Sequence, residues 1–171
     1  HWAKILTGRG VEVLTYAKDR SETTRQRAEN VGVKCVSSIT TLVGDADVIV
    51  SIVVPSAAKR VATKVAKAVT KSGRRDLVYL DANAISPMTA DAIGQVLQSS
   101  GVNFVDGCII GSATKMDKGA VIYVSGPQAA KIQELEPYGF SIKVLGPTVA
   151  QASAFKVVYA GLTKGLQGLF V

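Results

Sequence analysis

The chain has 171 residues, of which 47% are hydrophobic and 19% charged, and its formal net charge is +7. This length and composition predict one globular domain with a real core, and they exclude a disordered chain. No apolar run reaches the ~18 residues of a membrane helix, so we expect no membrane partner. The single histidine, His1, stands at the terminus, which argues against Ser-His or Cys-His catalysis and against a histidine-based zinc site.

Strand patterns and helical patterns alternate along the whole chain. The strand patterns cover residues 11–15, 33–36, 47–54, 76–81, 103–106, 120–125 and 142–145, and the helical ones cover 2–6, 22–31, 38–43, 56–69, 86–97 and 128–136. The run 47–54 is continuously apolar, which is typical of a strand buried on both faces of a parallel sheet. The alternation predicts an α/β fold with a Rossmann-like, doubly wound and mostly parallel sheet.

The start of a dinucleotide-binding fold is missing from this pattern. Such a fold opens with a strand, a GxGxxG loop and a helix, and the sequence contains no GxGxxG. Gly8-Arg-Gly10 precedes a strand, whereas the motif must follow one. We therefore expect the first strand and its loop to lie upstream of His1. The strands at 11–15 and 47–54 must then either meet or leave a gap with unpaired backbone groups.

Two explanations of this missing front stay open. One is an incomplete sequence, and the other is a natural remnant that has lost cofactor binding. A first residue that is not methionine indicates a cut or processed start. We expect a cytoplasmic protein, with a lost targeting segment as the alternative.

The loop after the strand at 11–15 bears on the choice of cofactor. Domains that bind NAD carry an acid at this place to hold the ribose hydroxyls. Here Lys18 and Arg20 flank Asp19, and two cations could hold a 2′-phosphate. We interpret the loop as selecting NADP, with NAD as the less favoured choice and an ordinary charged loop as the alternative.

Four further segments form an ordered pattern. They are 48–55, an apolar strand that ends in Pro55; 79–87, Tyr-Leu-Asp-Ala-Asn-Ala-Ile-Ser-Pro; 104–112, Phe-Val-Asp-Gly-Cys-Ile-Ile-Gly-Ser; and 151–159 with Lys156, in a C-terminal helix rich in small residues. In order and spacing they resemble the β-hydroxyacid dehydrogenase family, which includes 3-hydroxyisobutyrate and 6-phosphogluconate dehydrogenases. The resemblance covers nearly the whole chain.

The resemblance implies the positions of the site residues. Those expected at the cofactor are Val54, Pro55, Lys59, Asn83 and Ala84, and those expected at the substrate are Ile110, Gly111 and Ser112. Lys156 corresponds to the catalytic acid/base of the family. Its apolar neighbours favour the neutral amine, which accepts a hydroxyl proton. Lys164 would either add like-charge repulsion in the same cleft or lie on the surface.

The resemblance also implies an organisation and a reaction. Residues 1–147 would be an incomplete dinucleotide-binding domain, and 148–171 the start of an interdomain helix leading to a helical domain that closes the active site and forms a homodimer. The reaction would be hydride transfer from a small β-hydroxy acid to NADP. Departures leave the substrate open: Ile110 replaces a serine of the substrate loop, Asn83 and Ala84 replace a hydroxyl pair, and Tyr159 replaces an asparagine.

Two other classes of function stay in view. A non-catalytic remnant could use the C-terminal helix as a docking surface for another protein. A basic stripe on residues 60–71, made of Arg60, Lys64, Lys67 and Lys71, could in principle bind nucleic acid. It has no stacking aromatic residues or known motif beside it, so we interpret it as a solvated helix face and expect no nucleic-acid partner.

Overall fold

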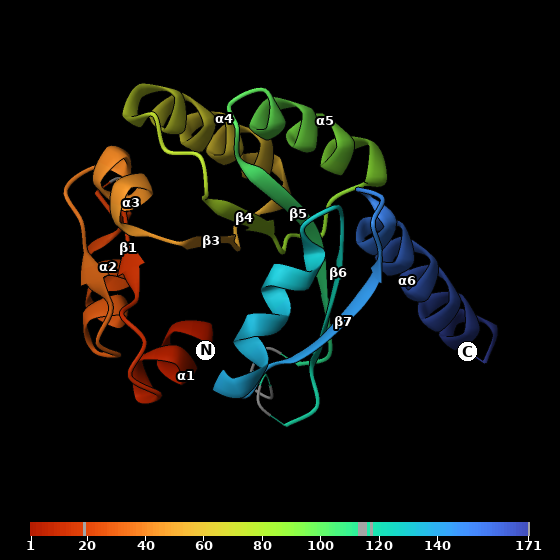
Figure 1. The fold of residues 1–171 in the computed structure, drawn as a ribbon. Helices are drawn as coiled ribbons and strands as arrows, with labels where there is room; N and C mark the ends of the chain where they lie inside the picture. The colour runs from red at the N-terminus through yellow and green to blue at the C-terminus, as the bar shows by residue number, and fades with distance from the viewer. Residues whose placement is uncertain (19, 113–115, 117, 171) are drawn as a thin grey trace.

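The computed structural model describes residues 1–18, 20–112, 116 and 118–170. The strands are β1 (Leu14–Thr15), β2 (Lys34–Cys35), β3 (Val48–Ser51), β4 (Val78–Asp81), β5 (Asn103–Ile110), β6 (Val121–Ser125) and β7 (Ser141–Gly146). The helices are α1 (Trp2–Gly8), α2 (Glu22–Glu29), α3 (Ile39–Asp45), α4 (Pro55–Ser72), α5 (Pro87–Gln98), the 3₁₀ helix η2 (Ala129–Tyr138) and α6 (Gln151–Leu169). Figure 1 shows their arrangement.

The main sheet has the strand order β3-β4-β5-β6-β7. All neighbouring pairs in it are parallel except β5 and β6, which are antiparallel. The predicted α/β class with a mostly parallel sheet is therefore confirmed. Strand β5 extends beyond the predicted 103–106 through Ile110, because its second half pairs with β6 as far as Val121.

A second, two-stranded sheet contains only β1 and β2, which are parallel. Among the described residues, neither of these strands pairs with β3, and the two sheets stand apart in Figure 1. Of the two expected arrangements, the structure thus adopts the gap. One edge of β3 and both edges of the small sheet consequently lack a strand partner in the described part of the chain, where backbone groups would otherwise pair.

Helices cover both faces of the main sheet, so the protein has two hydrophobic cores. Helices α3, α4 and α5 close the first core, which contains alanine and valine side chains of α4 together with Tyr79 and Phe104 of the sheet. Helix α1 and η2 close the second core, where Trp2 packs on Phe140 with ring centroids 4.5 Å apart. Burial on both faces explains why β4 is entirely apolar until Asp81.

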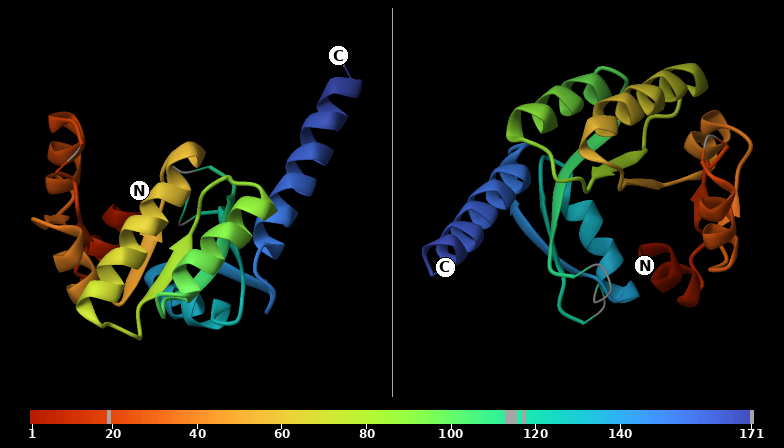
Figure 2. Two further views of the ribbon diagram at one scale, coloured as in Figure 1. Left: turned by 90° about the horizontal axis from the view of Figure 1, so that it is seen from above. Right: turned by 180° about the vertical axis from the view of Figure 1, so that it is seen from behind.

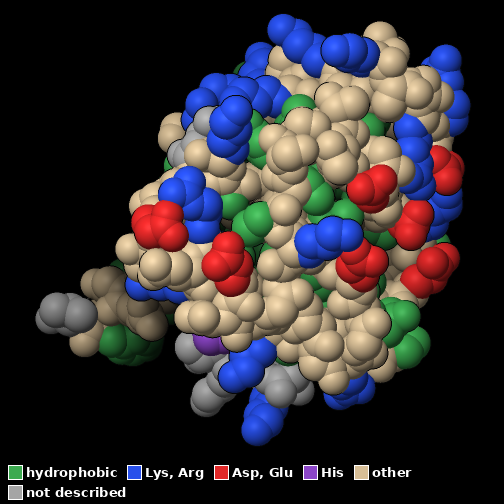
Figure 3. Space-filling model, turned by 90° about the vertical axis from the view of Figure 1, so that its left-hand side faces the viewer, with side chains coloured by type: hydrophobic (Ala, Val, Ile, Leu, Met, Phe, Trp, Pro, Cys, Tyr) green, Lys and Arg blue, Asp and Glu red, His purple; other side chains and the backbone are tan. Residues whose placement is uncertain are grey.

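Local sequence signals set where the covering helices begin. Helix α4 starts with Pro55 at its first turn, and α5 starts with Ser86 as N-cap and Pro87 as the next residue. The basic stripe lies on the exposed face of α4, whereas Val65 and Val69 of the same helix are buried. Figure 3 shows Lys and Arg side chains along its upper edge, the edge over which α4 runs in Figure 1.

Helix α6 begins against β5 and β6 and then projects away from the body of the protein, as both views of Figure 2 show. Its first turn is buried at Ala152 and Ser153, while Val158, Leu162, Leu166 and Leu169 are exposed. In the described part of the chain, no helix has both the length and the hydropathy needed to span a membrane. The same residues contain no cluster of potential metal ligands.

Candidate cofactor and catalytic site

The carboxyl ends of β3 and β4 are joined by the side chain of Asn83. Its Oδ1 accepts a hydrogen bond of 2.6 Å from the backbone N–H of Val53. Its Nδ2 donates to Ser51 Oγ at 3.0 Å and to Asp81 Oδ1 at 2.8 Å. Asn83 is 4% exposed, so its amide is committed to these internal contacts and holds the loop after β3 in place.

These hydrogen bonds of Asn83, which we call the Asn83 clamp, end β3 earlier than the sequence predicts. The apolar run continues to Val54, but the strand stops at Ser51. The bond from Val53 to Asn83 draws the chain away from the sheet edge and into the loop that leads to α4. The predicted strand over 47–54 is therefore correct in its first half, and its second half forms a loop.

Asp81 lies at the centre of the clamp and is fully buried. Its Oδ1 accepts from both the N–H and the side chain of Asn83, while its Oδ2 has no hydrogen-bond partner among the described residues. Burial raises the pKa of Asp81 to about 6, and the bonds from Asn83 only partly offset this. The carboxyl end of β4 thus holds a carboxyl group that takes up a proton in mildly acidic solution.

Beside the clamp lies an exposed apolar wall, which we define as Ile52, Val54, Pro55 and Ala84. The exposed fractions of Ile52 and Val54 are 52% and 66%, unusually high for such side chains at the end of a buried strand. Pro55 and Ala84 are also exposed, and Lys59 is exposed one turn into α4. Four of the five residues expected at the cofactor therefore face solvent here. The fifth, Asn83, is buried and holds their loop in place through its hydrogen bond with Val53.

The loop after β1 borders a hollow of about 280 Å³. Its lining comes from the ends of both strands of the small sheet and from α2: Ala17, Lys18, Arg25, Cys35, Val36 and Ser37. Arg25 also forms an exposed ion pair with Glu22. Of the two predicted phosphate contacts, Lys18 lines the hollow, whereas Arg20 is an exposed residue of the same loop outside that lining. Asp19 lies outside the described residues.

The carboxyl end of β5 meets Lys156 of α6. The Nζ of Lys156 donates a hydrogen bond to the carbonyl oxygen of Ile109, and the lysine is half-buried. Ile110 is the last residue of β5, and Gly111 and Ser112 follow it in exposed positions. The structure therefore places Lys156 beside the end of the strand that leads into the three residues expected at the substrate, of which Ile110 belongs to the strand itself.

Lys156 is also close to Cys108 in β5. Burial raises the pKa of the Cys108 thiol to about 11, and the charge of Lys156 partly opposes that rise. The thiol therefore stays protonated at neutral pH and is not a nucleophile. Lys164 is exposed farther along α6, which agrees with its interpretation as a surface residue.

The sequence did not predict the two residues, Asp106 and Ser125, that anchor the first turn of α6. Asp106 and Ser125 lie opposite each other on the antiparallel strands β5 and β6 and accept hydrogen bonds from the first turn of α6. A buried acid in an apolar strand was visible at position 106, but its partners are 19 and 47 residues away. Sequence spacing gives no signal for such a contact.

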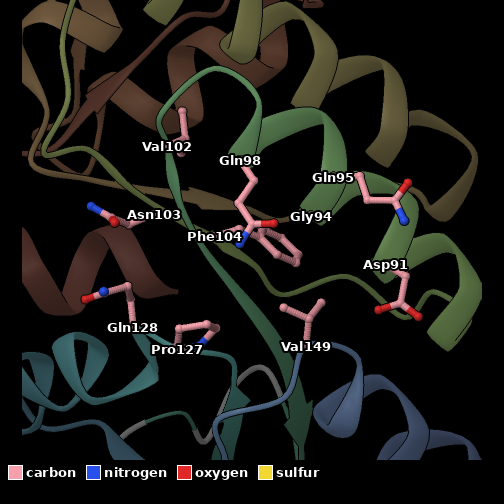
Figure 4. A pocket seen from close by; sticks show the side chains of 10 residues that line it. All are labelled: Asp91, Gly94, Gln95, Gln98, Val102, Asn103, Phe104, Pro127, Gln128 and Val149. Atoms are coloured by element: carbon pink, nitrogen blue, oxygen red, sulfur yellow. The ribbon is translucent and has the colours of Figure 1, made fainter.

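A second hollow of about 200 Å³ lies at the amino end of β5, away from Lys156 (Figure 4). The side chains of Gln98, Asn103 and Gln128 surround it, and Phe104 and Val149 line its apolar part. The candidate site lies instead at the carboxyl ends of β3, β4 and β5, where doubly wound sheets bind their ligands.

Comparison with known proteins identifies this arrangement. Residues 1–142 match the family described as the NAD binding domain of 6-phosphogluconate dehydrogenase. The chain belongs to this family. The match includes both sheets except for most of β7, and it ends before α6.

Individual relatives of this NAD-binding domain agree with the assignment. An uncharacterized 28.5 kDa protein of Methanothermus fervidus is 35% identical over 161 residues, which are 94% of this chain and 60% of that protein. A solved protein of unknown function, described as structurally similar to 3-hydroxyacid dehydrogenases, has a TM-score of 0.86 and 32% identity, over 98% of this chain and 61% of its own.

A third structure, the 3-hydroxyisobutyrate dehydrogenase of Mycobacterium tuberculosis with L-serine, has a TM-score of 0.78 at 19% identity and shows the same fold. It is covered over 55% of its length, and this chain over 94%. The chain thus spans little more than half the length of these relatives.

The residues present fit the two ends of a nicotinamide dinucleotide. The apolar wall offers an exposed surface to a ring, and the hollow beside β1 is lined by the cations Lys18 and Arg25. The two sites are at the carboxyl ends of strands on either side of the gap between the sheets. The pyrophosphate between those ends normally lies on a glycine-rich loop, and this sequence has no GxGxxG to supply it.

Proposed function

We propose that the chain is the cofactor-binding portion of an NADP-dependent oxidoreductase that oxidises a small β-hydroxy acid. The observation that carries the proposal is the position of Lys156, whose Nζ reaches the carbonyl of Ile109 at the carboxyl end of β5. Doubly wound sheets bind dinucleotides at this end, and the exposed wall next to β3 and β4 opens on the same end.

In this proposal the cofactor accepts hydride from the carbon that bears the hydroxyl group. Lys156 accepts the hydroxyl proton on its Nζ, for which the amine must be neutral and must exchange its bond to Ile109 for one to the substrate. Backbone groups at Gly111 and Ser112 lie where the chain leaves β5, and we assign them to the substrate. The short side chain of Ala84 leaves room for the ring above the Asn83 clamp.

The preference for NADP rests on Lys18 and Arg20. Lys18 lines the hollow at the end of β1, and the pair occupies the loop where an acid would hold the ribose of NAD. A 2′-phosphate would gain charge-assisted hydrogen bonds from these side chains.

The organisation that we propose has two domains. Residues 1–147 would form the dinucleotide-binding part, and 148–171, which contain α6, would begin the interdomain helix. The exposed leucines of α6 would then be covered by a helical domain, through which the enzyme forms a homodimer. We place the enzyme in the cytoplasm.

The test is turnover by the two-domain enzyme with a panel of β-hydroxy acids that includes 3-hydroxyisobutyrate and L-serine. Lys156→Ala should lower kcat by roughly 10²–10⁴-fold, the range for a lost general acid/base. Lys164→Ala is the matched control, because it removes a lysine from the exposed part of the same helix. Near-normal kcat in Lys156→Ala would refute the assigned role.

One observation favours a second candidate, a non-catalytic interaction module. Helix α6 exposes Leu162, Leu166 and Leu169 by 54–79% of their surface, which suits a docking helix as well as an interdomain helix. Absence of turnover with every acid in the panel, together with a stable complex formed through α6, would favour this candidate.

A further inference from the structure

Helix α6 begins without a cap of its own. Its N-cap residue, Ala150, has a left-handed backbone with φ 70° and no side chain that can accept a hydrogen bond. The first N–H groups of a helix have no partner within the helix and must find one elsewhere. Because Ala152 and Ser153 are buried, water cannot satisfy them here.

The missing cap is supplied by the sheet. The N–H of Ala152 donates to Ser125 Oγ at 2.9 Å, and the N–H of Ser153 donates to Asp106 Oδ2 at 2.8 Å. Ser153 Oγ also donates to Asp106 Oδ1 at 2.7 Å. The antiparallel register places Asp106 opposite Ser125, so the two acceptors stand side by side under the first turn of α6.

From this geometry we infer that Asp106 and Ser125 act together as positioning residues for Lys156. The inference rests on the function proposed above. Lys156 is one turn beyond Ser153, and its amine bonds to Ile109, which lies in the same strand as Asp106. Strand β5 therefore holds α6 at two points, and the cap at the first point determines where the amine lies at the second.

The chemistry of Asp106 suits this task. It is fully buried and forms no ion pair with any described residue, so its bonds are those to the helix and to Ser125. Burial raises its pKa, and the hydrogen bonds from Ser153 and Ser125 oppose that effect by stabilising the carboxylate. A negative group at the N-terminus of a 19-residue helix is also favoured by the helix dipole.

The test measures the accessibility of Lys156 directly in this chain. Native protein is treated with limiting acetic anhydride, and the acetylation of Lys156 relative to Lys164 is determined by peptide mass spectrometry. Lys164 is the internal reference, since it lies in the exposed part of the same helix. The variants are Asp106→Asn and Ser125→Ala, and the control is Ser141→Ala, an exposed serine of β7.

We expect the Lys156:Lys164 ratio to rise about fivefold in both variants, the change in population that a lost helix cap produces, and to stay unchanged in Ser141→Ala. Hydrogen exchange of the backbone amides of Ala152 and Ser153 should also become faster in the two variants. If the melting temperature falls but the labelling ratio does not change, the cap is only structural and the inference is wrong. Should Asp106→Asn fail to fold, Ser125→Ala decides by the same criterion. The measurement needs no substrate, so a failure of turnover counts against the proposed function and not against this inference.

Discussion

Asn83 was expected at the cofactor, but its side chain is used inside the protein, where it holds the loop after β3 in place. Its amide joins Val53, Ser51 and Asp81, so it fixes the loop whose exposed wall would meet the cofactor. The motif could be located from the sequence, because the order of the four segments is visible there. The direction of the side chain could not, because it depends on hydrogen bonds across 30 and 32 residues.

Replacing Asn83 with alanine should destabilise the fold by about 1–3 kcal/mol, because it removes the acceptor of the part-buried N–H of Val53 and the buried hydrogen bonds to Ser51 and Asp81. Urea denaturation of the variant measures this change. Asn30→Ala is the control, since Asn30 is exposed at the end of α2 and should matter by less than about 0.5 kcal/mol. Equal effects of the two substitutions would contradict the clamp.

Asp81 should make stability depend on pH in the direction opposite to an ion-paired acid. Its pKa in the folded state is about 6 against an ordinary 3.8, so between these values the folded state binds more protons than the unfolded state. Its contribution is therefore favourable below about pH 4 and is lost as pH rises through about 6.

The variant Asp81→Asn keeps the Oδ1 acceptor but cannot ionise. Its stability relative to the wild type should increase between pH 4 and pH 7 by at most about 3 kcal/mol, the value of a shift of roughly two pKa units. Denaturation curves for both proteins across this range provide the measurement. A constant difference between them would show that Asp81 is ionised in the folded protein throughout.

At the scale of elements, the order of strands and helices was predictable and several of their ends were not. The apolar run at 47–54 and the proline at 55 locate β3 and α4 correctly, since burial and proline act locally. The extension of β5 to Ile110 depends on its pairing with β6, and the 3₁₀ geometry of η2 appears where an ordinary helix was predicted. These features follow from tertiary contacts, which local patterns do not contain.

Two glycines should respond in opposite ways to alanine. A Cβ at Gly107 in β5 would lie 2.6 Å from Leu80 Cδ1 and 3.1 Å from the carbonyl oxygen of Asp81, so Gly107→Ala should cost about 1–3 kcal/mol. A Cβ at Gly161 in α6 would meet nothing within 4 Å, and the helix should gain about 0.5–1 kcal/mol. Thermal denaturation of both variants provides the comparison, and a loss in Gly161→Ala would show that α6 has a close neighbour in solution.

The whole molecule combines a +7 charge with two separated sheets. The absence of GxGxxG and the wrong order of Gly8-Arg-Gly10 predict a missing first strand, and they leave open whether the neighbouring strands meet or stand apart. What could not be predicted is that the small sheet keeps its own hollow with Lys18 in its lining, since that requires the relative placement of β1, β2 and α2. The charge raises a question of selectivity, because a positive protein attracts any phosphorylated ligand.

Coenzyme binding separates a local contact from this general attraction. Because the sequence has no GxGxxG, we expect this chain to bind either coenzyme only weakly, above the micromolar range, yet NADPH more tightly than NADH. Lys18→Ala and Arg20→Ala should each weaken NADPH binding by about 1.5–3 kcal/mol and leave NADH binding nearly unchanged, because only NADPH carries the 2′-phosphate.

Arg27→Ala is the matched control: it removes one positive charge from an exposed position in the last turn of α2, outside the lining of the hollow. A general electrostatic attraction would weaken the binding of both coenzymes in all three variants, and this effect would decrease with added salt. A direct contact at the loop would weaken the binding of NADPH alone. Fluorescence titration at two ionic strengths makes the distinction, and equal affinities for NADPH and NADH in the wild type would overturn the proposed preference for NADP.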